Sequence, residues 1–323
     1  MSVPVKLNCR NCKAKLDLSD CRPFDMVACP QCGTALRVPQ TFDRYLLEKL
    51  CGKGGDSLVY RALEPDLARR VAVKVESESG NRDTAERFVN SARISGKVNH
   101  PGVVQVFHCG TFEERAFMVM RYMEHGDLER MMKQKKLPGY LVILEWILAV
   151  VETLMAAGKN NIVHHDIKPA NIMLTANDEV KLGDWDIADI REPGDRQTPC
   201  TMWASPIYTS PERIFGGGED YKGDIFSLGV TLYELLSGGE APFGLHGDTD
   251  TIYKRRKEMN FRSLALLNPE VPPAIALLVN AMLDFQPENR PEYGDIQALI
   301  SVVIAGKRRV LQKQKNIKEN NDL

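Results

Sequence analysis

Residues 164–171, HHDIKPAN, decide the fold of this chain together with DWD at residues 184–186. Asp166 offers a carboxylate that can orient a hydroxyl group, Lys168 adds a cation two residues later, and Asn171 adds an amide oxygen. Phosphoryl transfer depends on positioning and charge neutralisation more than on covalent chemistry by the protein. Because these residue types supply both, the two segments predict a phosphoryl-transfer site.

These segments resemble the catalytic loop and the magnesium-binding segment of the protein kinase family, in particular its bacterial eukaryotic-like serine/threonine members. The resemblance covers about residues 42–305. It implies that Asp166 is the catalytic acid and that Lys168 neutralises the moving γ-phosphoryl group. It also implies that Asn171 and Asp184 hold Mg²⁺ or Mn²⁺. The expected reaction is transfer of phosphate from ATP to protein serine and threonine hydroxyls, including the chain's own.

The segment GKGGDSLV at residues 52–59 lies between two strand-like runs. Glycines let a hairpin backbone lie close over phosphate groups, although an ordinary hairpin has the same pattern. The resemblance places four of its residues against the nucleotide: Gly52, Gly54, Val59 and Ser57, which stands where the family has a third glycine.

Lys74 ends the apolar run VAVK at residues 71–74. In the family this lysine holds the α- and β-phosphates and counts among the catalytic residues, whereas a solvated cation at a strand edge is the alternative. The segment MVMRYM at residues 118–123 resembles the connector between the two lobes. By that resemblance the backbone of Arg121 and Met123 meets the adenine, although a plain strand and turn has the same pattern.

Besides Ser57, three positions depart from the family pattern. The glutamate that orients the strand lysine in the family would fall at position 91, which is a serine here. The nearest acid, Glu86, lies five residues earlier. This separation is a rotation of about 500° along the helix, so Glu86 points away from the face of Ser91. Asp186 replaces the glycine of the Asp-Phe-Gly motif, which either disturbs function or is a tolerated turn residue. His165 replaces an arginine that pairs with an activation-loop phosphate, so we expect a weaker dependence on loop phosphorylation.

Two CxxC pairs lie near the N-terminus, Cys9 with Cys12 and Cys29 with Cys32. Two such turns complete a tetrahedral four-sulfur shell, and their spacing resembles a zinc ribbon. Because a module this small cannot bury enough apolar surface alone, we expect the zinc to be structural. Four unligated thiols or a redox pair are the alternative, and Cys21 is expected to be a spare thiol.

Residues 204–212, ASPIYTSPE, resemble the end of a kinase activation segment. The hydroxyls in and before it are candidate phosphorylation sites: Thr198, Thr201 and Ser205. The resemblance also implies a buried ion pair between Glu212 and Arg290, and an Asp224 that braces the catalytic loop. Breaking a buried ion pair costs roughly 3–5 kcal/mol, so these residues support the fold.

The chain has 323 residues, 43% hydrophobic and 26% charged, with a formal net charge of −1. These values are typical of a globular protein with room for a large core. A near-neutral charge argues against nucleic acid as a partner of the whole chain. Charged residues interrupt the apolar stretch 141–157, and the first residues contain no signal-peptide pattern, so we expect a cytoplasmic protein without a membrane span.

Three regions follow from the pattern: a zinc ribbon at residues 1–39, a protein kinase domain at 42–305, and a basic, polar and disordered tail at 306–323. In the kinase region strands come first and helices after, which predicts an α+β fold with a small β-rich N-lobe and a helical C-lobe. The expected strands are 46–50, 57–63, 70–75, 103–109 and 116–122. The expected helices are 82–98, 141–157, 224–237 and 273–284.

An active serine/threonine protein kinase is the leading hypothesis. A nucleotide-binding pseudokinase scaffold is the main rival, because Ser57, Ser91 and Asp186 depart from the family pattern. A third hypothesis makes the ribbon an adaptor for nucleic acid or protein, but few aromatic side chains accompany its cations for base stacking. For the ribbon we therefore expect a protein contact or a purely structural role.

Overall fold

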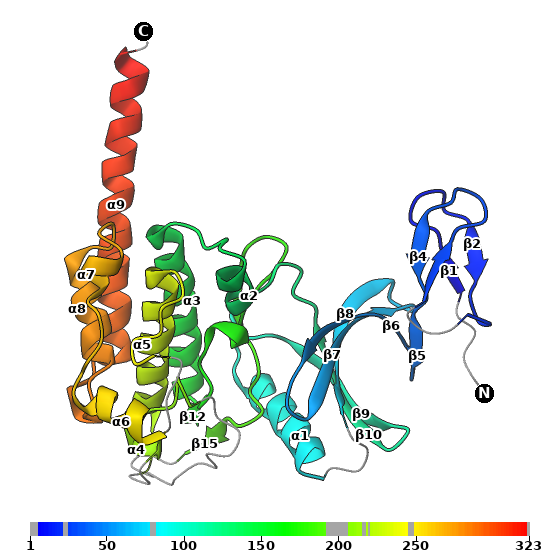
Figure 1. The fold of residues 1–323 in the computed structure, drawn as a ribbon, viewed down its shortest axis with the longest axis horizontal. Helices are drawn as coiled ribbons and strands as arrows, with labels where there is room; N and C mark the ends of the chain where they lie inside the picture. The colour runs from blue at the N-terminus through cyan, green and yellow to red at the C-terminus, as the bar shows by residue number, and fades with distance from the viewer. Residues whose placement is uncertain are drawn as a thin grey trace. The chain divides into compact units, whose positions relative to one another are not determined.

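The computed structural model describes residues 6–21, 25–77, 82–191, 206–214, 218, 220–244 and 249–321. The chain divides into two compact units (Figure 1). Unit 1 comprises residues 1–93 and 104–122, and unit 2 comprises residues 94–103 and 123–323.

The N-terminal part of unit 1 consists of two short β-hairpins. β1 (Lys6–Asn8) pairs with β2 (Lys15–Asp17), and β3 (Met26–Ala28) pairs with β4 (Ala35–Arg37). One small apolar cluster joins the two hairpins and contains Cys9, Leu16, Leu18, Cys29, Leu36 and Val38. A core of this size needs an additional crosslink for stability.

The rest of unit 1 is an antiparallel sheet with the strand order β5-β6-β7-β8-β10-β9, covered by helix α1 (Arg82–Lys97). Its strands are β5 (Gln40–Phe42), β6 (Tyr45–Lys53), β7 (Ser57–Glu64), β8 (Arg69–Glu76), β9 (Val106–Phe112) and β10 (Arg115–Arg121). Val73, Val75 and Phe117 lie in the apolar cluster of one face. Residues on the alternate positions, such as Met118, pack with Phe88 of α1 on the other face.

Unit 2 is mainly helical, and one apolar core joins its long helices. These are α3 (Tyr140–Gly158), α5 (Tyr221–Ser237), α8 (Pro273–Met282) and α9 (Tyr293–Asn321). α5 begins at the N-cap Asp220, which accepts a hydrogen bond from the N–H of Lys222 at 2.8 Å, and ends at Gly238 with φ 80°. The shorter helices are α2 (Leu128–Lys133), α4 (Pro211–Ile214), α6 (Thr249–Lys257) and α7 (Leu264–Leu267).

Two small sheets hold the loops that carry the predicted site residues of unit 2. β11 (Gly126–Asp127), β13 (Ile172–Leu174) and β14 (Val180–Leu182) form one sheet, and β12 (Ile162–Val163) pairs with β15 (Asp189–Ile190). Because β13 pairs with β14 and β12 pairs with β15, the loop before β13 lies beside the loop after β14. A backbone hydrogen bond of 2.9 Å, from the N–H of residue 183 to the carbonyl of residue 171, joins the two loops.

Helix α3 is the buried core helix that the sequence predicts. By length and composition alone it is apolar enough to cross a membrane, but half of its apolar window is buried inside unit 2. Its buried side chains include Ile147, Val150 and Val151. Packing within the core of unit 2 therefore accounts for its composition.

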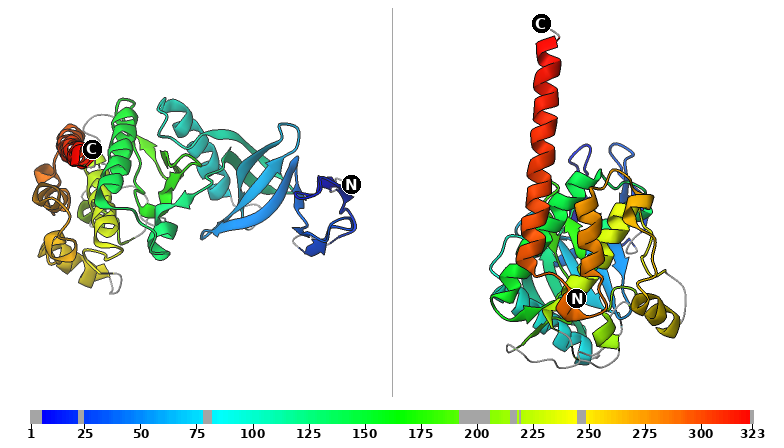
Figure 2. Two further views of the ribbon diagram at one scale, coloured as in Figure 1. Left: turned by 90° about the horizontal axis from the view of Figure 1, so that it is seen from above. Right: turned by 90° about the vertical axis from the view of Figure 1, so that its left-hand side faces the viewer.

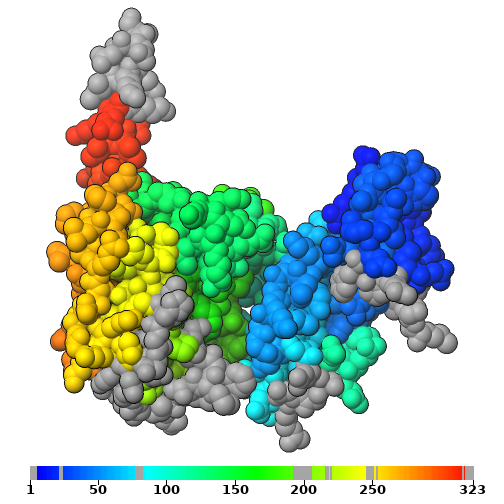
Figure 3. Space-filling model, viewed as in Figure 1, coloured from blue at the N-terminus to red at the C-terminus, as the bar shows by residue number. Residues whose placement is uncertain are grey.

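The C-terminal segment corrects one prediction. We expect disorder from residue 306, but α9 continues to Asn321 as one helix (Figures 1 and 2). Ile296, Ile300 and Ile304 anchor its first half in the core at helical spacing, and the lysines, arginines, glutamines and leucine beyond them have high helix propensity. Residues 305–314 are exposed, and Figure 3 shows this part standing clear of the rest of unit 2.

Candidate functional site

Four cysteine sulfurs meet in the N-terminal part of unit 1. The Sγ atoms of Cys9, Cys12, Cys29 and Cys32 all lie within 4.8 Å of one another. Cys9 and Cys32 are 3.6 Å apart, and Cys12 and Cys29 are 3.7 Å apart. Zinc–sulfur bonds of about 2.3 Å in a tetrahedron place the sulfurs about 3.8 Å apart, so the cluster fits zinc. With four protein ligands the ion has no open position, which makes such a site structural.

Both CxxC turns close in the same way. The N–H groups of Lys13 and Gly33 each donate to the carbonyl of the first cysteine of their pair, at 3.0 and 2.8 Å. Lys13 (φ 62°) and Gly33 (φ 71°) both adopt the left-handed conformation, which glycine reaches at no steric cost. A hydrogen bond with Thr34 lowers the pKa of Cys32 to about 6. The Ala14 backbone acts to lower the pKa of Cys12, but burial and the three neighbouring cysteines outweigh this effect and raise that pKa instead.

The glycine-rich turn joins β6 to β7 as a hairpin. Gly52 lies opposite Val59, and the N–H of Gly54 donates to the carbonyl of Ser57 at 2.8 Å. A Cβ atom on Gly54 would lie 3.2 Å from Ser57 Oγ, which is a tight contact, so this position favours glycine. Ser57 itself is buried and begins β7. The four predicted residues therefore lie together in one closed turn whose backbone can approach phosphates.

Lys74 lies on β8, between its cross-strand neighbours on β7 and β10. It is 9% exposed, and its Nζ atom lies 5.5 Å from the ring centre of Phe88 on α1. Ser91 of the same helix is buried, whereas Glu86 is exposed, as the predicted rotation requires. At the position where the resemblance expects a glutamate, α1 therefore presents a buried hydroxyl.

The predicted connector begins at the end of β10. The N–H of Arg121 donates to the carbonyl of Gln105 at 2.9 Å. Met123 is buried, and its carbonyl accepts a hydrogen bond from the N–H of Gly126 at 3.2 Å. Hydrogen bonds to the flanking segments thus fix the backbone on both sides of the boundary between the units.

Asp166, Lys168 and Asn171 converge in the loop between β12 and β13. Lys168 Nζ donates to Asp166 Oδ2 at 2.7 Å, and Asn171 Nδ2 donates to the same oxygen at 2.9 Å. Burial raises the pKa of Asp166; Lys168 opposes this rise and the charge of Asp184 adds to it. A carboxylate with a raised pKa is a better proton acceptor, which suits a group that orients a hydroxyl and takes its proton.

His164 holds the backbone of this loop as a neutral side chain. Burial lowers its pKa to about 4. Its Nε2 atom lies 3.1 Å from the carbonyl oxygen of Gly183, and its Nδ1 atom accepts from the N–H of Asp166 at 3.3 Å, which fits the tautomer protonated on Nε2. The carboxylate of Asp224 accepts from the N–H groups of His164 and His165 at 2.8 and 2.7 Å. The predicted bracing of the loop by Asp224 is confirmed.

His165 pairs with an acid of its own unit. Its side chain is 0% exposed, and its Nε2 atom lies 2.9 Å from Asp189 Oδ1. Arg191 donates to the same carboxylate at 2.8 Å. Burial acts to raise the pKa of Asp189, but the hydrogen bonds from His165 and Arg191 outweigh it and lower this pKa to about 2. His165 is thus paired with a carboxylate of its own unit.

The two aspartates of the DWD segment differ in backbone conformation. Asp184 has φ 61°, a sparsely populated region that is often found at functional sites. Asp186 has no positive φ and lies in a turn in which the N–H of Ala188 donates to the carbonyl of Trp185 at 3.2 Å. Since only a left-handed φ favours glycine, the backbone tolerates aspartate at position 186.

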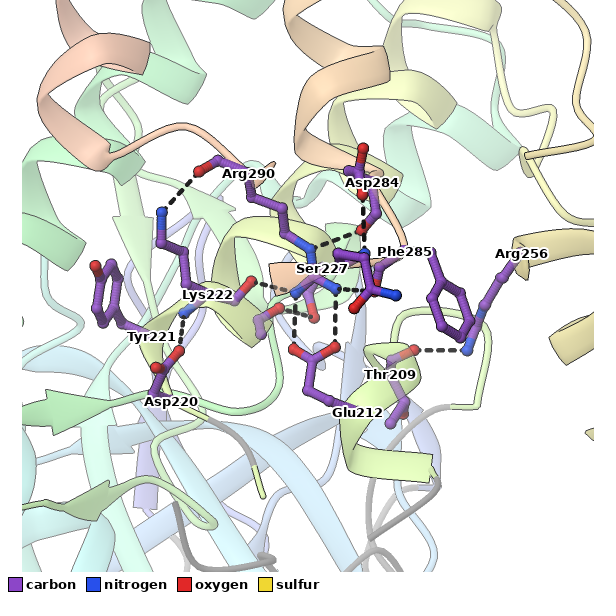
Figure 4. A network of polar contacts seen from close by, with 12 residues as sticks. Thr209, Glu212, Asp220, Tyr221, Lys222, Ser227, Arg256, Asp284, Phe285 and Arg290 are labelled. Carbon is purple, nitrogen blue, oxygen red and sulfur yellow. Dashed lines mark hydrogen bonds and ion pairs between the residues drawn. The ribbon is translucent and has the colours of Figure 1, made fainter. Parts of the chain in front are cut away.

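The end of the activation segment is held by a buried ion pair (Figure 4). The guanidinium of Arg290 donates to both carboxylate oxygens of Glu212, at 2.7 and 2.8 Å, and the arginine side chain is 0% exposed. The predicted pair is confirmed. The candidate phosphorylation sites Thr198, Thr201 and Ser205 lie outside the described residues.

Arg256 of α6 is a buried cation that sequence analysis missed. Its guanidinium donates to the carbonyls of Pro206, Ile207 and Thr209 at 2.6 to 2.7 Å, and Figure 4 shows the contact to Thr209. It also lies 5.4 Å from the ring centre of Phe226, and burial lowers its pKa to about 10. One side chain thus fixes three carbonyls of the activation segment. No local pattern signals it, because its partners are distant in sequence.

Comparison with known proteins agrees with this geometry. Residues 45–299 match the family model described as protein kinase domain. A probable serine/threonine-protein kinase of Clostridium perfringens is 32% identical over 251 residues, which are 77% of this chain and 36% of that protein. Probable serine/threonine-protein kinase PknB of Lactococcus lactis is 31% identical over 265 residues, 81% of this chain and 42% of that protein.

Serine/threonine-protein kinase PknL of Mycobacterium tuberculosis is 31% identical over 259 residues, which cover 79% of this chain and 64% of that protein. The chain spans less than half of the length of the first two relatives. The zinc-compatible cysteines precede the residues that match the family model. Since that model matches most of the chain, and the catalytic-loop residues converge as the motif requires, the chain belongs to the protein kinase family.

Proposed function

We propose that this chain is a Mg²⁺-ATP-dependent serine/threonine protein kinase that phosphorylates protein hydroxyls, including its own. The convergence of Lys168 and Asn171 on the buried carboxylate of Asp166 is the observation that carries the proposal. In this role Asp166 orients the substrate hydroxyl and accepts its proton. Lys168 donates to the γ-phosphoryl group as its charge develops.

The remaining predicted residues bind the nucleotide and its ion. Asn171 and Asp184 offer the oxygen ligands that Mg²⁺ prefers, and the ion would neutralise charge on the phosphates. Lys74 holds the α- and β-phosphates beneath the turn of Gly52, Gly54, Ser57 and Val59. The backbone of Arg121 and Met123 meets the adenine. These assignments rest on the resemblance, and the hairpin and buried Lys74 of unit 1 support them.

A pseudokinase scaffold is the second candidate, and Ser91 is the observation that favours it. A helix without the glutamate leaves the orientation of Lys74 to another group. This candidate predicts that the chain binds nucleotide without transferring phosphate.

We further propose a cytoplasmic location and protein substrates with serine or threonine. For the ribbon we propose structural zinc and contact with a protein partner. The near-neutral net charge of −1 and the scarcity of aromatic residues in the ribbon argue against nucleic acid as its ligand.

Transfer of labelled phosphate from ATP with Mg²⁺ or Mn²⁺, to the chain and to a generic protein, tests the proposal. We expect labelling by the wild type and by Asp66→Asn, which changes an exposed acid, and its loss in Asp166→Asn. Equal labelling by Asp166→Asn would contradict the assigned role. No labelling by folded, zinc-loaded wild type that is still stabilised by Mg²⁺-ATP would favour the pseudokinase.

A further inference from the structure

Glu76 ends β8 with a buried carboxylate. It is 2% exposed, and its Oε2 atom accepts a hydrogen bond from the N–H of Ala116 at 2.9 Å. Removing a carboxylate from water is costly unless it is both hydrogen-bonded and paired with a cation. The N–H of Ala116 supplies a hydrogen bond without formal charge, and a cation on the same face of the strand would stabilise this carboxylate further.

Lys74 lies two residues before Glu76 on the same strand. Side chains alternate between the faces of a strand, so Lys74 and Glu76 both point to the face of the sheet on which Met118 packs against Phe88 of α1. The position of Lys74 Nζ, 5.5 Å from the ring centre of Phe88, agrees with this direction. Cα atoms two residues apart on a strand are separated by about 6.6 Å, which the side chains of lysine and glutamate can bridge.

The other acids of unit 1 are less suited to form an ion pair with Lys74. In the part of unit 1 that the structure describes, the buried acids are Glu64 and Glu76. Glu64 already forms ion pairs with Arg69 at 2.7 Å and with Arg44 at 3.8 Å. On α1, position 91 is a serine and Glu86 is exposed to solvent.

We propose that Glu76 is the carboxylate that orients Lys74 toward the phosphates, in place of the family's helix glutamate. The inference rests on the proposed kinase function, and Glu76 acts in it as a positioning residue, through Lys74. Because one strand fixes both members of the pair, their contact does not depend on the position of α1. Movement of that helix is a common means of controlling kinases, and this arrangement makes the lysine independent of it.

Four variants test the inference: Glu76→Gln, Ser91→Glu, the double variant, and Glu86→Gln as a control on the exposed face of α1. Glutamine at 76 keeps an oxygen that can accept from Ala116, so Glu76→Gln removes the charge and retains the hydrogen bond. We expect it to lower kcat/KM for ATP about tenfold or more, the loss expected for one hydrogen bond to a charged group, and Glu86→Gln to leave kcat/KM unchanged. The double variant should recover most of this loss, because it restores a carboxylate from the helix.

The thermal stabilisation of each variant by Mg²⁺-ATP is measured beside transfer. If the wild type transfers no phosphate, the proposed activity fails, and this binding measurement still decides the role of Glu76. A folded Glu76→Gln with wild-type kcat/KM and ATP stabilisation would overturn the inference. A loss in Glu76→Gln that Ser91→Glu does not recover would also overturn it, because the role of Glu76 would then be structural.

Discussion

Arg87 of α1 forms an ion pair and a hydrogen bond with Asp56, in the glycine-rich turn between β6 and β7. Thr84 Oγ1 lies 3.0 Å from Arg87 Nη2 and donates to Asp56 Oδ2 at 3.3 Å. The carbonyl of Asp56 also accepts from the N–H of Ser77 at 2.9 Å. The turn assigned to the phosphates is thereby tied to α1 and to the end of β8.

Replacing Arg87 by alanine should loosen this turn. The side chains of Arg87 and Asp56 are 16% and 29% exposed, so the pair contributes at most about 1 kcal/mol. We expect KM for ATP to rise by up to about fivefold, because the freed turn must be ordered when the nucleotide binds. Steady-state kinetics measure this, with Arg93→Ala as the control on an exposed arginine of the same helix. Equal KM values for the two variants would show that the Arg87–Asp56 ion pair does not order the turn.

The buried pair of Arg290 and Glu212 should dominate the local stability of unit 2. Arg290→Ala leaves the Glu212 carboxylate without its cation and removes a hydrogen bond of 2.8 Å to the carbonyl of Lys222. We expect a loss of roughly 3–5 kcal/mol in the free energy of unfolding, measured by urea denaturation.

Arg308→Ala is the matched control for this variant. Arg308 pairs with Glu145 at 2.8 Å, but the two side chains are 65% and 34% exposed. Such a pair contributes less than about 1 kcal/mol. Similar losses in the two variants would contradict the argument that burial makes the Arg290 pair costly to break.

The sequence predicts those parts of the fold whose signal is local. Helices at 141–157, 224–237 and 273–284 appear as α3, α5 and α8 with ends shifted by at most three residues, because apolar periodicity and length mark them. Cysteine spacing likewise predicts the four-sulfur cluster. The β9 strand starts at Val106 and not at residue 103, because Val103 forms a bridge to Leu182 in unit 2.

The parts that sequence analysis missed depend on contacts between distant segments. Asp189 becomes a partner of His165 only when β15 pairs with β12. Arg256 satisfies carbonyls about fifty positions away, and the link from Asp56 to Arg87 requires α1 to lie against the sheet. Neither residue type nor spacing predicts such pairs. The Glu212–Arg290 pair could be predicted because both of its members lie in motifs of the family.

Cys29→Ser should release zinc and unfold the ribbon. The Sγ atom of Cys29 belongs to the four-sulfur cluster, and the apolar core joining the hairpins is too small to hold them alone. Zinc content and nuclear magnetic resonance of the ribbon measure the effect. Cys21→Ser is the control, because Cys21 packs beside the core outside the cluster and should leave zinc bound. Zinc retained by Cys29→Ser and lost by Cys21→Ser would refute the assigned ligand set.

Glu234 of α5 should make the stability of unit 2 depend on pH near neutrality. Burial raises the pKa of Glu234 to about 7, although the hydroxyl of Tyr208 donates to its carboxylate at 2.7 Å. Between the unfolded value of about 4.5 and the folded value of about 7, the folded state binds a proton that the unfolded state has released. The stabilising contribution of this proton is complete below pH 4.5, and it is lost as the pH rises through 7.

Glu234→Gln isolates this contribution, because the amide oxygen can still accept from Tyr208 and carries no charge. We expect the free energy of unfolding of the variant, relative to the wild type, to rise by up to roughly 3 kcal/mol between about pH 5 and pH 8. Urea denaturation at a series of pH values measures the difference. Glu288→Gln, which changes an exposed glutamate of the same unit, should follow the wild-type curve. A difference between Glu234→Gln and the wild type that stays constant with pH would mean that the Glu234 carboxylate is ionised throughout this range, and that the fold tolerates its buried charge.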